Sequence, residues 1–132
     1  MSTPLEGLRV IELAHVMAGP ICGLFLGDLG ADVIKVERLP GGDTTRYFSP
    51  PEIEGESAAF MMLNRGKRGV ALDLRTEEGR AVVRQMVSSA DVVIENFRAG
   101  TMERMGLGYE ALALLNERLI YCQVTGFGRT GP

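Results

Sequence analysis

Short apolar runs alternate with stretches of helical periodicity along this chain. Five runs rich in Val, Ile and Leu predict buried strands at residues 9–14, 33–37, 69–74, 91–97 and 119–124. Helices are predicted between them, over residues 19–29, 58–63, 77–90, 101–105 and 109–115. Buried strands separated by helices are typical of right-handed βαβ crossovers, so the pattern predicts an α/β fold with a doubly wound parallel sheet.

Local signals support two of the helix starts and one loop. Pro20 suits the first turn of a helix, and Thr76 is a good N-cap before the acidic pair Glu77 and Glu78. Residues 39–51 are rich in proline and glycine and predict a loop.

Composition narrows the class of protein. Hydrophobic residues make up 45% of the 132-residue chain and charged residues 23%, which is typical of one folded domain. Gly, Asp or Arg interrupts every apolar run, so no membrane helix is expected, and the N-terminus lacks a secretory signal. Cys22 and Cys122 match neither a disulfide framework nor a metal-binding spacing, so we expect a cytoplasmic protein with no metal.

Charge is distributed unevenly. Lys and Arg number 14 against 17 Asp and Glu, a net charge of −3, which disfavours nucleic acid as a partner. Residues 64–104 nevertheless hold 8 basic and 6 acidic side chains, a local net of +2. This balance favours a small anionic ligand.

Arginines follow three of the predicted strands. Arg38, Arg75 and Arg98 each come directly after one, and Arg104 lies a few residues further on. Parallel strands end at the same sheet edge, so these side chains predict a site for several separated anionic groups. The basic segment at residues 64–68 has two interpretations, a phosphate-holding loop or a solvated turn.

Other motifs leave the chemistry open. The chain has neither the G-x-G-x-x-G fingerprint nor a P-loop, since Gly66-Lys67 is followed by Arg68. His15, the only histidine, ends the first predicted strand, where a structural or binding role is favoured over catalysis. No carboxylate stands out as a nucleophile.

Several stretches match, in order, a known family. They are residues 5–10, Ala18-Gly19-Pro20, 26–37, Gly41-Gly42-Asp43, 64–68, 72–74, 90–98, 104–107, 125–128 and Thr130-Gly131-Pro132. Together they resemble the N-terminal segment of the class III CoA-transferase family, the carnitine dehydratase and bile-acid-inducible group. Residues 1–132 are then expected to form the CoA-binding, Rossmann-like part of a larger, interlocked homodimer.

The resemblance implies transfer of CoA from an acyl-CoA to a carboxylic acid through an aspartate nucleophile. That aspartate is expected beyond Pro132, so the chain alone should be inactive. By position, the residues implied at the CoA site are Val16, Met17, Arg38, Leu72, Arg75, Asn96, Phe97 and Arg104. The arginines would meet phosphates, and Val16, Leu72 and Phe97 would flank the adenine or pantetheine.

Two other interpretations stay open. One is an α-methylacyl-CoA racemase of the same family, which uses a downstream His–Asp pair; Ala18 favours the transferase. The other is a truncated, non-catalytic CoA-binding module. Met17 replaces the glutamine of formyl-CoA:oxalate-type members and cannot donate its hydrogen bonds, which disfavours formate and oxalate.

Overall fold

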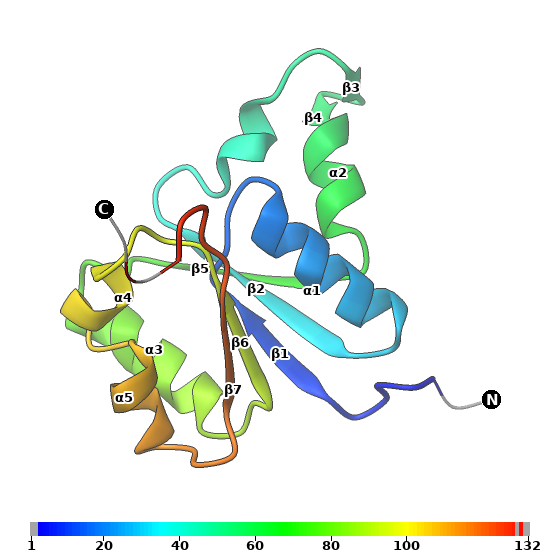
Figure 1. Cartoon of the computed structure of the whole chain (residues 1–132). Coiled ribbons are helices and arrows are strands. Elements are labelled where there is room, and N and C mark those ends of the chain that lie inside the picture. Colours follow the sequence, from blue (N-terminus) through cyan, green and yellow to red (C-terminus); the bar gives the residue numbers. More distant parts are fainter. Residues whose placement is uncertain (1–2, 129, 131–132) are drawn as a thin grey trace.

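The centre of the molecule is a five-stranded parallel sheet in the order β5-β2-β1-β6-β7 (Figure 1). The computed structural model describes residues 3–128 and residue 130, so the Gly131-Pro132 motif lies outside the described residues. The predicted parallel α/β sheet is confirmed. Its strands are β1 (Arg9–Glu12), β2 (Asp32–Arg38), β5 (Arg68–Leu72), β6 (Val92–Glu95) and β7 (Ile120–Gln123).

The chain reverses its direction of travel across the sheet at β1. From β1 it moves outward through β2 to β5, and it then returns to place β6 on the other side of β1. Such a reversal opens a crevice at the carboxyl ends of the two central strands, where α/β proteins bind ligands. The fold therefore places a candidate site beyond β1 and β6.

Helices cover both faces of the sheet, as the doubly wound prediction requires (Figure 1). On one face lies α1 (Ala18–Asp28), against which α2 (Ala58–Asn64) packs; the other face carries α3 (Glu77–Val87), α4 (Thr101–Arg104) and α5 (Tyr109–Ala113). The Thr76 hydroxyl accepts the Gly79 N–H at 3.1 Å, so the predicted cap of α3 is confirmed. None of the helices in the described part of the chain is long and apolar enough to cross a bilayer.

Two apolar cores result, one on each face. Val10 and Ile11, neighbours on β1, are both fully buried but belong to different clusters, because successive side chains point to opposite faces. Val10 packs on the α1 side with Val33 and Ile94, and Ile11 belongs to the larger cluster that includes Val83 of α3. Burial on both faces explains why the inner strands β1, β2 and β6 lie in apolar runs of the sequence.

The segment expected to be a loop contains more structure than predicted. It holds a 3₁₀ helix, η1 (Thr44–Tyr47), and is followed by a small antiparallel hairpin of β3 (Glu52–Ile53) and β4 (Glu56–Ser57). Glu54 and Gly55 form its turn with positive φ angles of 53° and 84°. Two-residue strands that are mostly exposed have no apolar alternation, so the sequence pattern could not show them.

Candidate ligand-binding site

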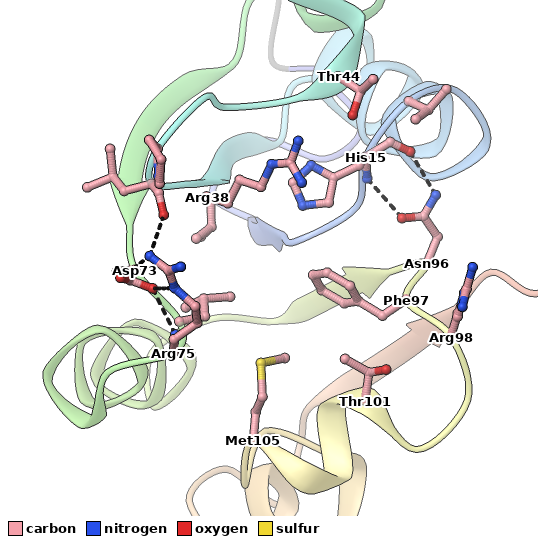
Figure 2. Close-up of a pocket in the computed structure, with 15 residues that line it drawn as sticks. His15, Arg38, Thr44, Asp73, Arg75, Asn96, Phe97, Arg98, Thr101 and Met105 are labelled. Atoms are coloured by element: carbon pink, nitrogen blue, oxygen red, sulfur yellow. Dashed lines mark hydrogen bonds and ion pairs between the residues drawn. The ribbon is translucent and has the colours of Figure 1, made fainter.

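A cavity of about 610 Å³ opens at the carboxyl edge of the sheet, beside the crevice between β1 and β6 (Figure 2). Segments that follow β1, β2, β5 and β6 build its walls, and α4 closes one side. Its lining consists of His15, Val16, Val36, Arg38, Leu39, Pro40, Thr44, Asp73, Leu74, Arg75, Asn96, Phe97, Arg98, Thr101 and Met105. This volume falls in the range of small-molecule sites.

The three strand-end arginines meet at this cavity. Arg38, Arg75 and Arg98 all line it, which confirms the prediction that they share one edge of the sheet. In Figure 2 their guanidinium groups come from three different segments around Phe97. The cavity can therefore hold a ligand with anionic groups at separated positions.

Two of these arginines are already hydrogen-bonded. Arg38 Nε donates to the Gly42 carbonyl at 3.0 Å. Arg75 forms a bidentate pair with Asp73, with Nε–Oδ1 and Nη2–Oδ2 distances of 2.8 Å. The hydrogen bonds from Arg75 lower the pKa of Asp73 to about 2, so this carboxylate is charged at neutral pH.

The aromatic ring of Phe97 lines the cavity. Phe97 meets His15 edge to face, with ring centroids 5.6 Å apart and planes at 70°. The Phe97 N–H donates to Glu95 Oε2 at 2.8 Å, and Glu95 is fully buried. Burial raises the pKa of Glu95. The Phe97 backbone is thus anchored to a buried carboxylate, and its ring lines the cavity, where it can contact a flat or apolar ligand group.

His15 lines the site, and its imidazole is more easily held neutral than an exposed one. Burial lowers the pKa of His15, even though Asp43 opposes this effect, and its Nδ1 lies 3.9 Å from Asp43 Oδ2. A neutral imidazole between Phe97 and the backbone suits binding better than acid catalysis. The structural or binding role favoured from the sequence stays a prediction for this cavity-lining residue.

Five of the eight residues implied by the family resemblance line the cavity, namely Val16, Arg38, Arg75, Asn96 and Phe97. Three do not contribute to the lining. Met17 is 54% exposed at the start of α1, and Leu72 lies at the end of β5, next to Asp73. Arg104 donates through Nη2 to the hydroxyl of Thr101, a lining residue, at 2.9 Å. Arg104 is therefore adjacent to the cavity and can reach a ligand that extends past α4.

The basic segment at residues 64–68 does not belong to this site. Arg65 pairs with Asp28 at 2.6 Å and Arg68 with Asp32 at 2.8 Å, both on the surface. The Lys67 side chain is only 2% exposed and contacts Glu12 at 2.8 Å. The segment's three positive charges each pair with a carboxylate of the protein, and none of the three side chains lines the cavity. The structure therefore gives no support to the interpretation as a phosphate-holding loop at this site.

A buried charge network underlies the site and was not predicted. Lys35 Nζ contacts Glu12 Oε1 at 3.0 Å and Asp43 Oδ2 at 2.9 Å, and all three side chains are at most 2% exposed. Lys67 completes the network on the other Glu12 oxygen, and burial lowers the pKa of Lys67. The sequence signal that could have indicated this network is the presence of charged residues inside the apolar runs that form β1 and β2.

Potential metal ligands are dispersed over residues 3–128 and 130: no three His, Cys, Asp or Glu side chains there come together in a metal-binding arrangement. Cys22 and Cys122 carry free thiols and pack against the same apolar cluster under α1. Burial raises the pKa of Cys22, so this thiol is protonated at neutral pH.

The sheet order defines a Rossmann-like α/β protein with an arginine-lined cavity at its topological switch. The sequence narrows this class further. Residues 5–132 match CoA-transferase family III, and the chain belongs to that family.

Similar proteins include named CoA-transferases. The chain is 56% identical over 135 residues to succinate–glutarate CoA-transferase of Agrobacterium fabrum, a match that covers 98% of the chain and 34% of the relative. It is 44% identical over 129 residues to succinyl-CoA:glutarate CoA-transferase of Mus musculus, covering 98% and 30% respectively. The chain thus spans about a third of the length of these relatives.

Solved structures of similar proteins also match this chain over about a third of their own length. A CAIB/BAIF family protein from Brucella suis superposes with a TM-score of 0.94 at 56% identity, over 100% of this chain and 36% of that one. The protein Rv3272 of Mycobacterium tuberculosis gives a TM-score of 0.91 at 44% identity, over 98% and 35%. This chain therefore has the fold of about one third of each of these proteins.

Proposed function

We propose that the cavity binds the nucleotide part of coenzyme A, and that the chain is the CoA-binding part of an enzyme that moves CoA from an acyl-CoA to a carboxylic acid. The observation that carries this proposal is the convergence of Arg38, Arg75 and Arg98 on one cavity at the topological switch. Membership of CoA-transferase family III supports the same ligand.

The chemistry of CoA matches the lining. The coenzyme carries a 3′-phosphate and a pyrophosphate, which need guanidinium groups at separated places, and it carries an adenine ring and an apolar pantetheine arm. Phe97 and Val16 offer contacts for the ring and the arm, and Arg104 extends the charged wall past Thr101. The placement of each CoA group on these residues is part of the proposal.

The proposed mechanism needs a nucleophilic aspartate in addition to the residues described above. The family's aspartate attacks the thioester carbonyl and forms a mixed anhydride as CoA thiolate leaves; the thiolate then attacks the aspartyl carbonyl, which releases the donor carboxylate and gives an enzyme–CoA thioester. The acceptor carboxylate attacks this thioester to form a second anhydride and release the thiolate, and the thiolate attacks the acceptor's acyl carbonyl to give the new acyl-CoA and the free aspartate. That aspartate is proposed beyond Pro132. The residues described above bind and orient CoA during these steps, within a homodimer that is proposed to be cytoplasmic.

The proposed acyl groups are short dicarboxylates. The relative from Agrobacterium fabrum, at 56% identity, is a succinate–glutarate CoA-transferase, and the murine relative is named for succinyl-CoA and glutarate. Succinyl-CoA as donor and glutarate as acceptor are therefore the first pair to assay. A racemase would instead exchange the α-proton of a 2-methylacyl-CoA with deuterium from solvent, without moving CoA.

Calorimetric titration with CoA and with dephospho-CoA, which lacks the 3′-phosphate, tests the binding proposal. Arg38→Ala removes one charge-assisted contact worth about 1.5–3 kcal/mol, so CoA should bind at least about tenfold more weakly. Arg68→Ala is the matched control, because Arg68 pairs with Asp32 at the opposite end of the strands.

Three results would count against the proposal. They are no CoA binding by the unaltered protein, equal losses in both variants, and no loss in Arg38→Ala. If dephospho-CoA binds as well as CoA, the 3′-phosphate has been placed wrongly on the arginines. Transfer of CoA from succinyl-CoA to glutarate by the full-length enzyme, followed by chromatography, then tests the activity.

A further inference from the structure

The turn from β1 into α1 is held in a conformation that its own sequence disfavours. Val16 has a φ of +68°, in the left-handed region, although its side chain is β-branched. Such a residue is a genuine outlier, and it persists only where the surrounding structure imposes it. Val16 also lines the cavity, so the outlier lies at the proposed CoA site.

Side chains from other segments hold the backbone of this turn. Lys35 Nζ donates to the Ala14 carbonyl at 2.9 Å, and Asn96 makes two hydrogen bonds of 2.8 Å with the N–H and carbonyl of His15. The N–H of Val16 donates to both carboxylate oxygens of Asp43, at 3.2 and 3.3 Å. Asp43 therefore contacts the strained residue itself, whereas the other two side chains hold its neighbours.

Asp43 is itself immobilised. Its side chain is fully buried, and it accepts hydrogen bonds of 2.9 Å from the N–H and hydroxyl of Thr45 and an ion pair of 2.9 Å from Lys35. Its N–H donates to Glu37 at 2.9 Å. A carboxylate fixed on this many sides can determine the position of the backbone that it contacts.

The location of Asp43 connects two walls of the cavity. Its neighbour Thr44 lines the cavity from the segment after β2, and Val16 lines it from the segment after β1. The hydrogen bond from Val16 to Asp43 therefore fixes one wall relative to the other. No other hydrogen bond described for Val16 gives its N–H a partner.

We propose that Asp43 is a positioning residue, whose carboxylate holds Val16 in the left-handed conformation and so sets the shape of the CoA cavity where α1 begins. The inference rests on the proposed function for the identity of the ligand, but its conformational part stands on the contacts alone. Asp43 acts through Val16 and touches no reacting atom.

A double-mutant cycle tests this role through CoA affinity measured by calorimetry. In Asp43→Asn an amide NH₂ replaces one acceptor, so it faces the Val16 N–H or Lys35 as a second donor. CoA should bind at least about tenfold more weakly, since the loss of a charged hydrogen bond has this size. Glycine adopts positive φ freely, so in a Val16→Gly background the same Asp43→Asn change should cost less than about twofold in affinity.

A role limited to global stability would give another result. If Asp43→Asn lowers the melting temperature but leaves CoA affinity unchanged, or weakens affinity equally in both backgrounds, the proposal is overturned. Asp32→Asn is the matched control, because it removes an exposed carboxylate at the amino end of β2 and should leave affinity unchanged.

Two further measurements keep the proposal testable. If Asp43→Asn does not fold, Thr45→Val removes only one hydrogen bond to Asp43; a weaker CoA affinity supports the proposal and an unchanged one overturns it. If the unaltered protein binds no CoA, the proposed function fails separately. The φ of Val16 from NMR couplings then decides, since retention of the left-handed conformation in Asp43→Asn overturns the proposal.

Discussion

Asn96 makes a two-way hydrogen bond with the backbone of His15: its Oδ1 accepts the N–H and its Nδ2 donates to the carbonyl, both at 2.8 Å. The two residues are 81 positions apart in the sequence and join the ends of β1 and β6. The Asn96 side chain thus ties together the carboxyl ends of the two central strands, and both residues line the cavity.

Asn96→Asp is expected to weaken both folding and CoA binding. A carboxylate cannot donate to the His15 carbonyl, and leaving that buried acceptor unpaired costs about 1–3 kcal/mol. Urea denaturation measures the stability, and CoA titration measures the affinity. Asn116→Asp is a matched control, because the Asn116 amide donates to the carbonyls of Val87 and Ala90 away from the cavity. It should lose similar stability with unchanged CoA affinity; a parallel loss of affinity would contradict the local role of Asn96.

Lys67→Met should be strongly destabilising. It leaves Glu12 buried with one of its two lysine partners gone, and breaking a buried ion pair costs about 3–5 kcal/mol. Arg68→Met, one residue away, removes an exposed pair with Asp32 and should cost less than about 1 kcal/mol. The free energies of unfolding in urea compare the two variants. Equal small losses would show that Glu12 does not depend on Lys67.

His15 should titrate below its ordinary pKa of 6.5, because burial disfavours its charged form. As the only histidine, it gives a single set of imidazole signals in an NMR titration. The Asp43 carboxylate raises the pKa of His15, so Asp43→Asn should lower it further. A value above 6.5 in the unaltered protein would show that the Asp43 charge outweighs burial.

Asp43 should contribute to acid stability in a defined window. Burial raises its pKa, but hydrogen bonds from Thr45 and Lys35 outweigh burial and lower it from 3.8 to about 2. A lowered pKa in the folded state stabilises the protein above pH 3.8, and this contribution is lost as the pH falls towards 2. Unfolding free energies between pH 5 and pH 2 should therefore fall less steeply in Asp43→Asn than in the unaltered protein. The same slope in both would contradict the lowered pKa.

The inner strands of the sheet could be predicted from the sequence because β1, β2 and β6 are largely buried on both faces, whereas the edge strands β5 and β7 are exposed or half-buried. Val10 and Ile11 belong to different cores, so the run that contains them is apolar without alternation. The hairpin turn at Glu54 and Gly55 left no such pattern, because its strands are short and mostly exposed. A buried element leaves an apolar run in the sequence, and a short exposed hairpin does not.

The candidate site was predictable only in part. Arg38, Arg75 and Arg98 could be placed together because the carboxyl ends of parallel strands coincide. The role of Lys67 could not be predicted, since its partner Glu12 lies 55 residues away and a buried lysine looks the same in sequence as a solvated one. The left-handed φ of Val16 had no sequence signal either, because it is imposed by the tertiary contact with Asp43.

The pairing of Arg75 with Asp73 partly neutralises the charge of the cavity wall. Asp73 serves as an internal counter-ion, so an anion that binds Arg75 must compete with a carboxylate that is already bound in bidentate geometry. A larger polyanion gains contacts with Arg38 and Arg98 at the same time, which offsets the displacement of Asp73. We therefore expect the cavity to discriminate between ligands by the number and spacing of their charges.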